Sequence, residues 1–247
     1  MNETPPPPPE GTVPPPPPPA GEPPPPPPPP PSEPPSGTLS TGPEPYPVDV
    51  SIEYQDRELN RTTTFFRFFT VIPIGIIVAL LAGSGARYGD SDVAVGVAGA
   101  IITFPTALMI IFQEKYPRWW FDFNRQMTAF LLRVAAYVLL IEDRYPSTDE
   151  PQGVDLTLDY PNVTAELNRF MPLIKWLLAI PHYIVLFFLW IGVFFGTIYA
   201  WFMILFTGRY PKDLFEFVEG VIRWNTRVAG YVSLLVTDRY PPFSLSR

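Results

Sequence analysis

Long stretches without a charged side chain constrain the fold of this chain more than any other feature. They cover residues 68–86, 93–113 and 176–208. A helix rises 1.5 Å per residue, so about 20 residues cross the roughly 30 Å hydrocarbon core of a bilayer. The first two stretches each suffice for one span, whereas the third is too long for one span and slightly short for two. We therefore expect an integral membrane protein.

The body of the sequence repeats itself. Val-Asp-Val-Ser-Ile-Glu-Tyr at 48–54 corresponds to Val-Asp-Leu-Thr-Leu-Asp-Tyr at 154–160, and Asp-Arg-Tyr-Pro closes both copies at 143–146 and 238–241. Alternating apolar and polar residues are typical of a strand. Each copy therefore predicts a short strand, then a transmembrane hairpin, then an amphipathic helix. The two strands can pair with each other outside the bilayer.

The two copies differ in the signal for the hairpin turn. The first copy has a polar turn at 83–92, whereas the second has none. We place the second turn near 190–192, because matching halves should share one topology. The alternative is a single long tilted span with a separate helix before Pro181.

Residues 117–141 and 211–236 predict two amphipathic helices, since their charged residues fall on one narrow stripe at 100° per residue. We expect both helices in the membrane interface with the charged ridge toward water. A third span per copy, with these charges inside the bundle, is the alternative. With four spans and interfacial helices, every Lys and Arg except Arg87 lies on the side of the termini. The positive-inside rule makes that side of the cell membrane cytoplasmic.

Residues 1–47 hold most of the 36 prolines. Such a segment buries too little apolar surface to offset its ordering entropy, so we expect a disordered tail with polyproline II character. It is either a docking arm for a cytoplasmic protein with an aromatic-lined groove or a solvated spacer. The predicted domains are this tail, a first membrane repeat at 48–146 and a second at 147–247.

The composition excludes several kinds of chemistry. The chain has no cysteine, one histidine and a net charge of −7, which argues against thiolate metal sites and against nucleic acid as a partner. The carboxylates show no metal-ligand spacing, and no catalytic motif is present. We predict no enzyme, no metal site and no cofactor. For His182 we expect a hydrogen-bonded or interfacial imidazole, with a proton relay as the alternative.

Basic side chains are the remaining candidates for contacts with lipid headgroups or with a partner protein. For Arg144 and Arg239 we expect a local ion pair with the preceding aspartate, at 143–144 and 238–239, that ends the helix, and a headgroup or partner contact is the alternative. The candidates are Arg61, Arg125, Arg133, Arg144, Arg169, Arg223, Arg227 and Arg239.

Several motifs resemble the domain-of-unknown-function family 4389, which is typical of actinobacteria and often has a proline-rich end. They are Leu-Asn-Arg at 167–169, Ile-Pro-His-Tyr at 180–183, Phe-Thr-Gly-Arg-Tyr-Pro at 206–211 and Thr-Asp-Arg-Tyr-Pro-Pro-Phe at 237–243. The resemblance covers about residues 46–245. The first copy departs from it at Ile74, which replaces His, and at Gln113-Glu114, which replace Thr-Gly. The family implies a multi-pass membrane location and no activity.

The expected fold is an all-α membrane protein. It is a tandem repeat of short strand, transmembrane hairpin and interfacial amphipathic helix behind the disordered tail. The expected function is a non-enzymatic scaffold or adaptor that uses the proline-rich arm, with the bilayer and a cytoplasmic protein as partners. A small transporter, channel or lipid-handling membrane protein is the alternative. The oligomeric state stays open.

Overall fold

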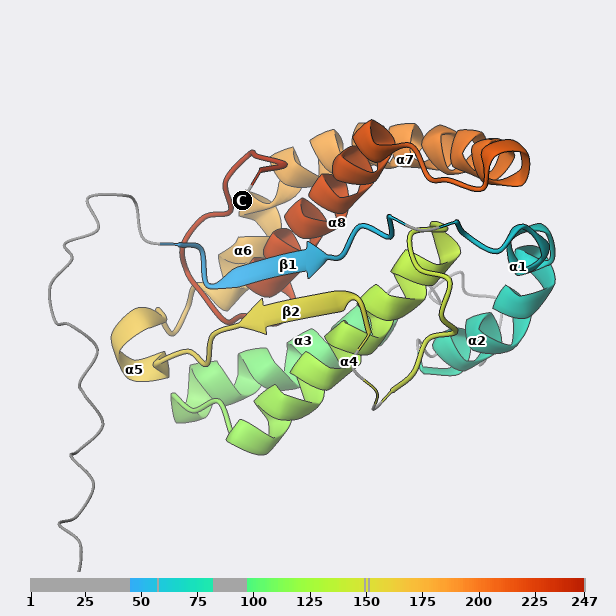
Figure 1. Cartoon of the computed structure of the whole chain (residues 1–247). Coiled ribbons are helices and arrows are strands. Elements are labelled where there is room, and N and C mark those ends of the chain that lie inside the picture. Colours follow the sequence, from blue (N-terminus) through green and yellow to red (C-terminus); the bar gives the residue numbers. More distant parts are fainter. Residues whose placement is uncertain (1–44, 57, 82–96, 149, 151, 247) are drawn as a thin grey trace, which may run out of the picture. The chain divides into compact units, whose positions relative to one another are not determined.

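The computed structural model describes residues 45–56, 58–81, 97–148, 150 and 152–246, with backbone only at 80, 81 and 97–102. Residues 45–247 group into one compact unit. In chain order its elements are β1 (Val48–Ile52), α1 (Arg61–Phe65), α2 (Arg67–Leu81), α3 (Val97–Leu108), the π-helix η1 (Met109–Gln113), α4 (Arg118–Val138), β2 (Val154–Leu158), α5 (Val163–Glu166), α6 (Pro172–Leu178), α7 (Ile180–Thr207) and α8 (Lys212–Val232) (Figure 1).

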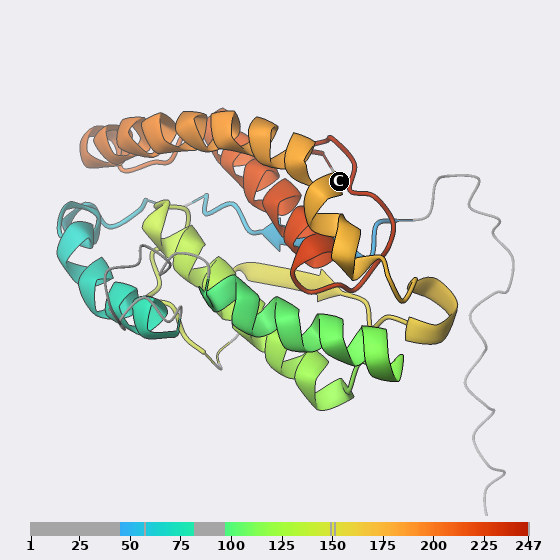
Figure 2. The same ribbon diagram turned by 180° about the vertical axis from the view of Figure 1, so that it is seen from behind.

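The two strands pair antiparallel, as the alternating patterns predict. Val50 faces Leu156 at the centre of the pairing, and Val48 faces Leu158 at one end. The apolar side chains of β1 are buried because α8 packs on β1, while α4 packs on β2. The strands lie in front of these helices in Figure 1, and the view from behind shows α3, α6 and α7 on the other side (Figure 2).

Matching tyrosines join the two halves of the chain. The Tyr54 hydroxyl donates to the carbonyl of Tyr210, just before α8, and the Tyr160 hydroxyl donates to the carbonyl of Tyr116, just before α4. These carbonyls precede Pro117 and Pro211, which stand at the helix N-caps. Each strand is thus followed by a tyrosine that holds the start of the other half's amphipathic helix.

The expected turn near residues 190–192 is wrong, because α7 runs through it as one 28-residue helix. The segment Trp-Ile-Gly at 190–192 carries no proline or polar pair that would end a helix. The helix ends instead at Gly208, whose φ of 75° suits glycine. The separate α6 before Pro181 agrees with the alternative of one long helix preceded by a short one.

The expected tandem repeat of transmembrane hairpins is also wrong. Among the described residues only α7 is long and apolar enough to cross a membrane, and the rest is a mostly helical fold with a small two-stranded sheet. The apolar helices of the first half are shorter, with 15 residues in α2 and 12 in α3. The predicted turn at 83–92, with Arg87, lies outside the described residues. Four spans are therefore not supported.

The charged stripe of α8 does not face water along its whole length, which corrects the expected interfacial helix. Arg223 and Arg227 are 5% and 4% exposed, because β1 covers this part of the stripe with Asp49. Lys212 and Glu216, nearer the start of α8, are exposed. The opposite face of α8 packs on α7. A polar side chain on β1 thus takes the place that the sequence pattern assigned to water.

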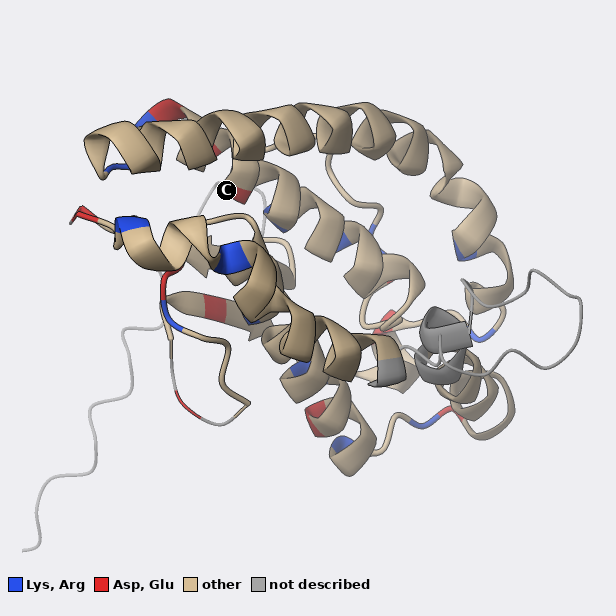
Figure 3. Ribbon diagram, turned by 90° about the vertical axis from the view of Figure 1, so that its right-hand side faces the viewer, with Lys and Arg blue, Asp and Glu red and all other residues tan. Residues whose placement is uncertain are grey.

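The surface of α7 is apolar and mostly uncovered. The helix contains no Lys, Arg, Asp or Glu, and Figure 3 shows it without charge along its length. Its buried stripe of His182, Leu186, Val193, Ala200 and Ile204 accounts for its packing within the chain. Phe187, Phe188, Phe194 and Phe195 are each more than 60% exposed.

Candidate functional site

Two buried cations sit at matching positions, seven residues after Asn60 and Asn168. Arg67 is 3% exposed; its Nη2 lies 2.6 Å from Oδ1 of Asp143, and its Nη1 donates to the carbonyls of Tyr137 and Glu142. The guanidinium also lies 4.2 Å from the centre of the Tyr137 ring. Asp143 in turn accepts from the backbone N–H of Asn60.

Lys175 repeats this arrangement in the second half. Its Nζ lies 2.7 Å from Oδ1 of Asp238, donates to the Thr237 carbonyl and lies 4.9 Å from the centre of the Tyr231 ring. Asp238 accepts from the backbone N–H of Asn168. Burial lowers the pKa of Lys175, and the carboxylate of Asp238 opposes this shift.

An apolar pocket lies where α2, the end of α4 and α7 meet. Its volume is about 560 Å³, within the usual range for small-molecule sites. Arg67 is its one charged lining residue. The Thr197 hydroxyl, which also lines the pocket, already donates to the Val193 carbonyl. The lining residues are Arg67, Phe68, Val71, Val138, Leu139, Leu140, Trp190, Val193, Phe194, Thr197, Ile198, Trp201 and Phe202.

One nitrogen of the Arg67 guanidinium is buried without a partner in the described part of the chain. Its Nε is buried and has no hydrogen-bond partner among the described residues. An unmet buried donor costs about 1–3 kcal/mol, more when it is charged. The pocket is therefore apolar apart from one arginine side chain, which Asp143 and two backbone carbonyls already bind.

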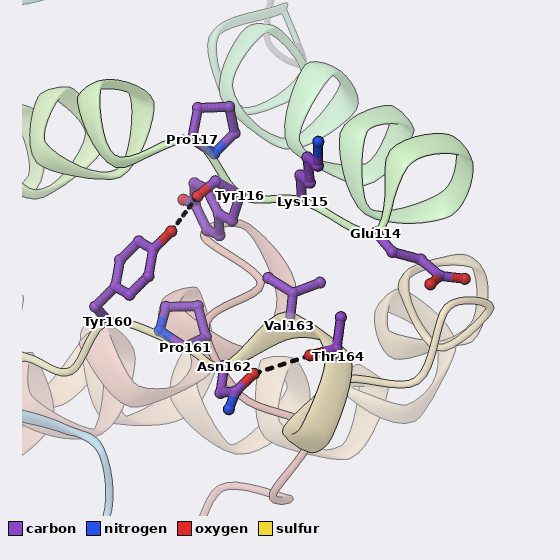
Figure 4. Close-up of a pocket in the computed structure, with 9 residues that line it drawn as sticks. All are labelled: Glu114, Lys115, Tyr116, Pro117, Tyr160, Pro161, Asn162, Val163 and Thr164. Atoms are coloured by element: carbon purple, nitrogen blue, oxygen red, sulfur yellow. Dashed lines mark hydrogen bonds between the residues drawn. The ribbon is translucent and has the colours of Figure 1, made fainter.

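A second, more open hollow of about 610 Å³ lies between residues 114–117 and residues 160–164 (Figure 4). The hydrogen bond from the Tyr160 hydroxyl to the Tyr116 carbonyl crosses it, and the Arg118 guanidinium lies 4.4 Å from the centre of the Tyr160 ring. Burial raises the pKa of Tyr116, whose hydroxyl accepts from Asn124. Its tyrosines are thus engaged in contacts within the chain.

His182 is fully buried beside α8. Its Nδ1 accepts a hydrogen bond from the indole N–H of Trp224, and its ring stacks on Phe243 with centroids 4.0 Å apart. Nε2 has no partner among the described residues. The expectation of a hydrogen-bonded imidazole is confirmed, and the contacts of Nδ1 and of the ring tie the C-terminal segment to α7 and α8.

The predicted arginines occupy different parts of the surface and interior. Arg223 and Arg227 meet at Asp49, and Arg169 binds both Glu114 and the Ile111 carbonyl. Arg133 donates to the carbonyls of Ser147 and Thr148, and Arg239 donates to that of Pro45. Of the eight candidate arginines, only Arg223 and Arg227 thus share a partner, and both are buried.

The three other candidates are exposed. Arg61 lies beside Gly208 at the end of α7. Arg125 is on the surface of α4, and Arg144 is in the segment that follows α4. The expected local pairing of Asp143 with Arg144, and of Asp238 with Arg239, is wrong. Each carboxylate reaches across to Arg67 or Lys175 instead.

Arg67 and Lys175 were missed as candidates for a site, since we used them only as the borders of apolar stretches. Their equal distance from the two Leu-Asn-Arg motifs was the signal that could have found them. In the described part of the chain, no group of three or more His, Asp or Glu side chains is placed to hold a metal ion.

Comparison with known protein families gives a match to part of the chain. Residues 172–244, from the start of α6 to beyond α8, match the family described as Domain of unknown function (DUF4389). This region contains Lys175, His182, α7 and the Asp238 carboxylate. No curated protein and no solved structure matches the chain.

Proposed function

We propose that this protein, with its DUF4389 region at 172–244, is a membrane-seated adaptor. The uncovered apolar surface of α7 and its neighbours enters the bilayer, and the proline-rich segment binds a partner protein from the water side. The observation that carries this proposal is the exposure of α7. Only 17% of its most apolar 18-residue window is buried within the protein.

The exposed apolar residues extend well beyond α7. Phe68, Phe104 and Phe112 from α2, α3 and η1 are 72%, 64% and 73% exposed, and Trp119 is 69% exposed. Soluble monomers seldom expose contiguous apolar patches larger than a few hundred Å². Tryptophan also favours the headgroup level of a bilayer. This surface supports seating in lipid.

The contacts of α7 favour an orientation in the plane of the membrane. Gly196, near the middle of α7, lies against Leu214 of α8, and the exposed residues Lys212, Asp213 and Glu216 flank that contact. If α7 stood perpendicular to the bilayer, these charges would lie near its midplane. Each would then cost roughly 2.5–3.5 kcal/mol. An α7 in the plane lets the exposed charges at the start of α8 face water.

The adaptor role rests on the proline-rich sequence that precedes β1. Its attachment point is fixed, because the Tyr46 hydroxyl donates to the Arg239 carbonyl and Arg239 donates back to the Pro45 carbonyl. Proline runs suit aromatic-lined grooves of partner domains because their extended form loses little entropy on binding. The apolar pocket favours lipid handling as a second candidate function.

Spin labels test the seating directly. The chain has no cysteine, so single cysteines at Ile184, Phe195 and Phe206 give unique labelling sites on the exposed face of α7. In vesicles we expect all three labels at similar shallow depth, as measured by oxygen and nickel accessibility. A label at Thr157, on the exposed side of β2, should stay in water. A deep label at 195 with shallow labels at 184 and 206 would contradict the in-plane orientation.

The adaptor role is tested by removing the arm. A variant without residues 2–44 should stay in the membrane fraction but lose its cross-linked partner proteins. The matched control keeps the length and replaces the prolines at 23–31 with Gly and Ser. It should lose the same partners if the extended proline conformation is what they recognise. Unchanged partners in both variants would refute the adaptor role.

A further inference from the structure

Each half of the chain has one arginine at a matching position, and the structure gives an anionic partner to only one of the two. Arg61 and Arg169 both follow a Leu-Asn pair. Nη1 of Arg169 lies 3.2 Å from Oε1 of Glu114. The ion pairs among the described residues do not include Arg61. A difference between the two halves at the residue that would supply the carboxylate accounts for this.

Gly208 takes the place of Glu114 in the second half, since both stand two residues before a Tyr-Pro pair. Both also end a helix in the left-handed region, with φ of 50° at Glu114 and 75° at Gly208. The backbone N–H of each donates to an isoleucine carbonyl four residues earlier. A Cβ at Gly208 would lie 3.4 Å from Nη2 of Arg61. A glutamate at this position would therefore have the Arg61 guanidinium within reach, as Glu114 has that of Arg169.

The charged side chains that flank Gly208 leave a positive charge unbalanced. Arg209 is exposed and, like Arg61, belongs to no ion pair among the described residues. Glu58 is the acidic neighbour, with its Cβ 3.8 Å from the place of a Cβ at Gly208, but the described ion pairs do not join it to Arg61. Two cations thus stand beside one carboxylate. In the other half the matching charges are balanced, and they belong to Glu114, Lys115, Glu166 and Arg169.

Exposed aromatic rings lie close to Arg61 in the chain and at the end of α7. Phe206, in the last turn of α7, is 77% exposed, and Phe65, four residues after Arg61 on α1, is 52% exposed. With α7 in the plane of the membrane as proposed above, such rings enter the lipid and a cation beside them lies at headgroup level. Phosphate is the anionic group that phospholipids present at that depth.

We propose that Arg61, with Arg209 beside it, binds a phosphate group, and that at the membrane this is the headgroup phosphate of an anionic phospholipid. Phosphate, like the carboxylate that Arg169 binds, offers paired oxygens to the fork of N–H donors on a guanidinium. The two halves of the protein thus satisfy matching arginines differently, one from within the chain and one from the lipid. This inference rests on the proposed membrane seating and is independent of the adaptor role.

Native mass spectrometry of the full chain counts the bound lipid. The protein is kept in an uncharged detergent and titrated with phosphatidylglycerol. We expect one tightly retained lipid per chain, and Arg61→Gln should lower its occupancy on the order of fivefold. Arg125→Gln removes an exposed arginine from the surface of α4 and is the matched control, which should leave the occupancy unchanged. Equal occupancy in Arg61→Gln and the unaltered protein would overturn the site.

Exchanging the residues at the two matching positions tests the site in both directions. Gly208→Glu should give Arg61 a partner within the chain and lower the occupancy as Arg61→Gln does. Gly208→Gln has the same size and the same backbone strain but no charge, so it should leave the occupancy nearly unchanged. Glu114→Gly should release Arg169 and allow a second lipid to bind. Equal losses in Gly208→Glu and Gly208→Gln would show that shape rather than charge is responsible, and would overturn the proposal.

Two further measurements separate the source of the phosphate from the seating of the protein. We expect inorganic phosphate to displace the lipid only at concentrations on the order of tenfold higher or more, because the lipid is confined to the same micelle as the protein. Displacement at equal concentrations would overturn the lipid as the source. Flotation with vesicles of phosphatidylcholine reports the seating alone, and all variants should float. A failure of the phosphate site is therefore distinguishable from a failure of the proposed function.

Discussion

The ammonium of Lys175 lies 2.7 Å from the carboxylate of Asp238, and the lysine side chain is only 1% exposed. Removing one partner of such a pair leaves a charge without its counterion. We expect Lys175→Met to lower the free energy of unfolding by about 3 kcal/mol, measured by denaturant titration in micelles. Lys212→Met, at the exposed pair with Glu216, should change it by less than about 0.5 kcal/mol.

The double variant Lys175→Met with Asp238→Asn is the internal control. The asparagine side chain retains an oxygen for the N–H of Asn168, which Asp238 binds now. It should recover part of the lost stability because no unpaired charge remains. A double variant as unstable as the single one would point to lost packing rather than to the ion pair.

Asp49 joins two arginines that α8 holds in the interior. Its Oδ1 lies 3.3 Å from Nε of Arg223 and 3.2 Å from Nη2 of Arg227. Arg223 keeps Glu219 as a partner, whereas Arg227 has no other carboxylate among the described ion pairs. We expect Asp49→Ala to destabilise the fold by about 2 kcal/mol. Asp155→Ala, on the exposed side of β2, should be close to neutral in the same titration.

The close approach of α8 to β1 depends on Gly230. A Cβ at this position would come within 2.7 Å of Cγ2 of Val48, a stiff and fully buried side chain. We expect Gly230→Ala to cost about 1–3 kcal/mol through overpacking. Gly75→Ala in α2, where a Cβ meets no atom within 4 Å, should be neutral or stabilising by up to about 1 kcal/mol. Adding Val48→Ala should restore part of the stability that Gly230→Ala loses. Thermal unfolding of Gly230→Ala, Gly75→Ala and the double variant Val48→Ala with Gly230→Ala measures these effects.

Buried tyrosines make the fold sensitive to alkali. Burial raises the pKa of Tyr116 and of Tyr210 above the usual value of 10.0. Their contribution to stability is complete below about pH 10 and falls as the pH rises further, because only the unfolded chain then loses these protons. The pKa of Lys175 is lowered in the fold, so its effect on stability has the opposite pH dependence. It destabilises the fold less as the pH rises toward 10.5. Denaturant titrations at pH 9, 10.5 and 11.5 should show that the free energy of unfolding decreases overall as the pH rises.

Tyr210→Phe isolates one of these groups. The Tyr210 hydroxyl is buried without a hydrogen-bond partner among the described residues, so its removal leaves no donor unpaired. We expect this variant to be neutral or slightly stabilised at pH 7 and to lose less stability between pH 10 and 11.5. An unchanged alkaline slope would show that Tyr210 ionises as freely in the fold as in the unfolded chain.

Local sequence patterns predicted the helices and strands well, but they predicted poorly what packs against each of them. The alternation at 48–54 and 154–160 identified β1 and β2 and their pairing, and the charged stripes identified α4 and α8 within a few residues. A helical wheel, however, separates polar from apolar faces without saying what covers the polar one. The inward position of Arg223 follows from Asp49, 174 residues earlier in the chain. No local pattern contains that contact.

The error at α7 had a different cause. The turn near 190–192 was transferred from the first half by analogy, against local signals that favour an unbroken helix. The site was missed for a similar reason. Arg67 and Lys175 bordered apolar stretches, and borders were interpreted as membrane limits. Their ring and carbonyl contacts come from residues about 60–75 positions away, beyond any window of sequence reasoning.

The strand pairing also fixes the order in which this protein can mature. Asp49 is synthesised 178 residues before Arg227. At typical elongation rates, this separation corresponds to roughly 10–35 s of translation. During that time β1 lacks α8 throughout and lacks β2 until residues 154–158 have been made, so its open edge is at first available to other chains. The nascent protein therefore stays vulnerable to aggregation until its last helix has emerged, and chaperones that act late in translation should matter most for its yield.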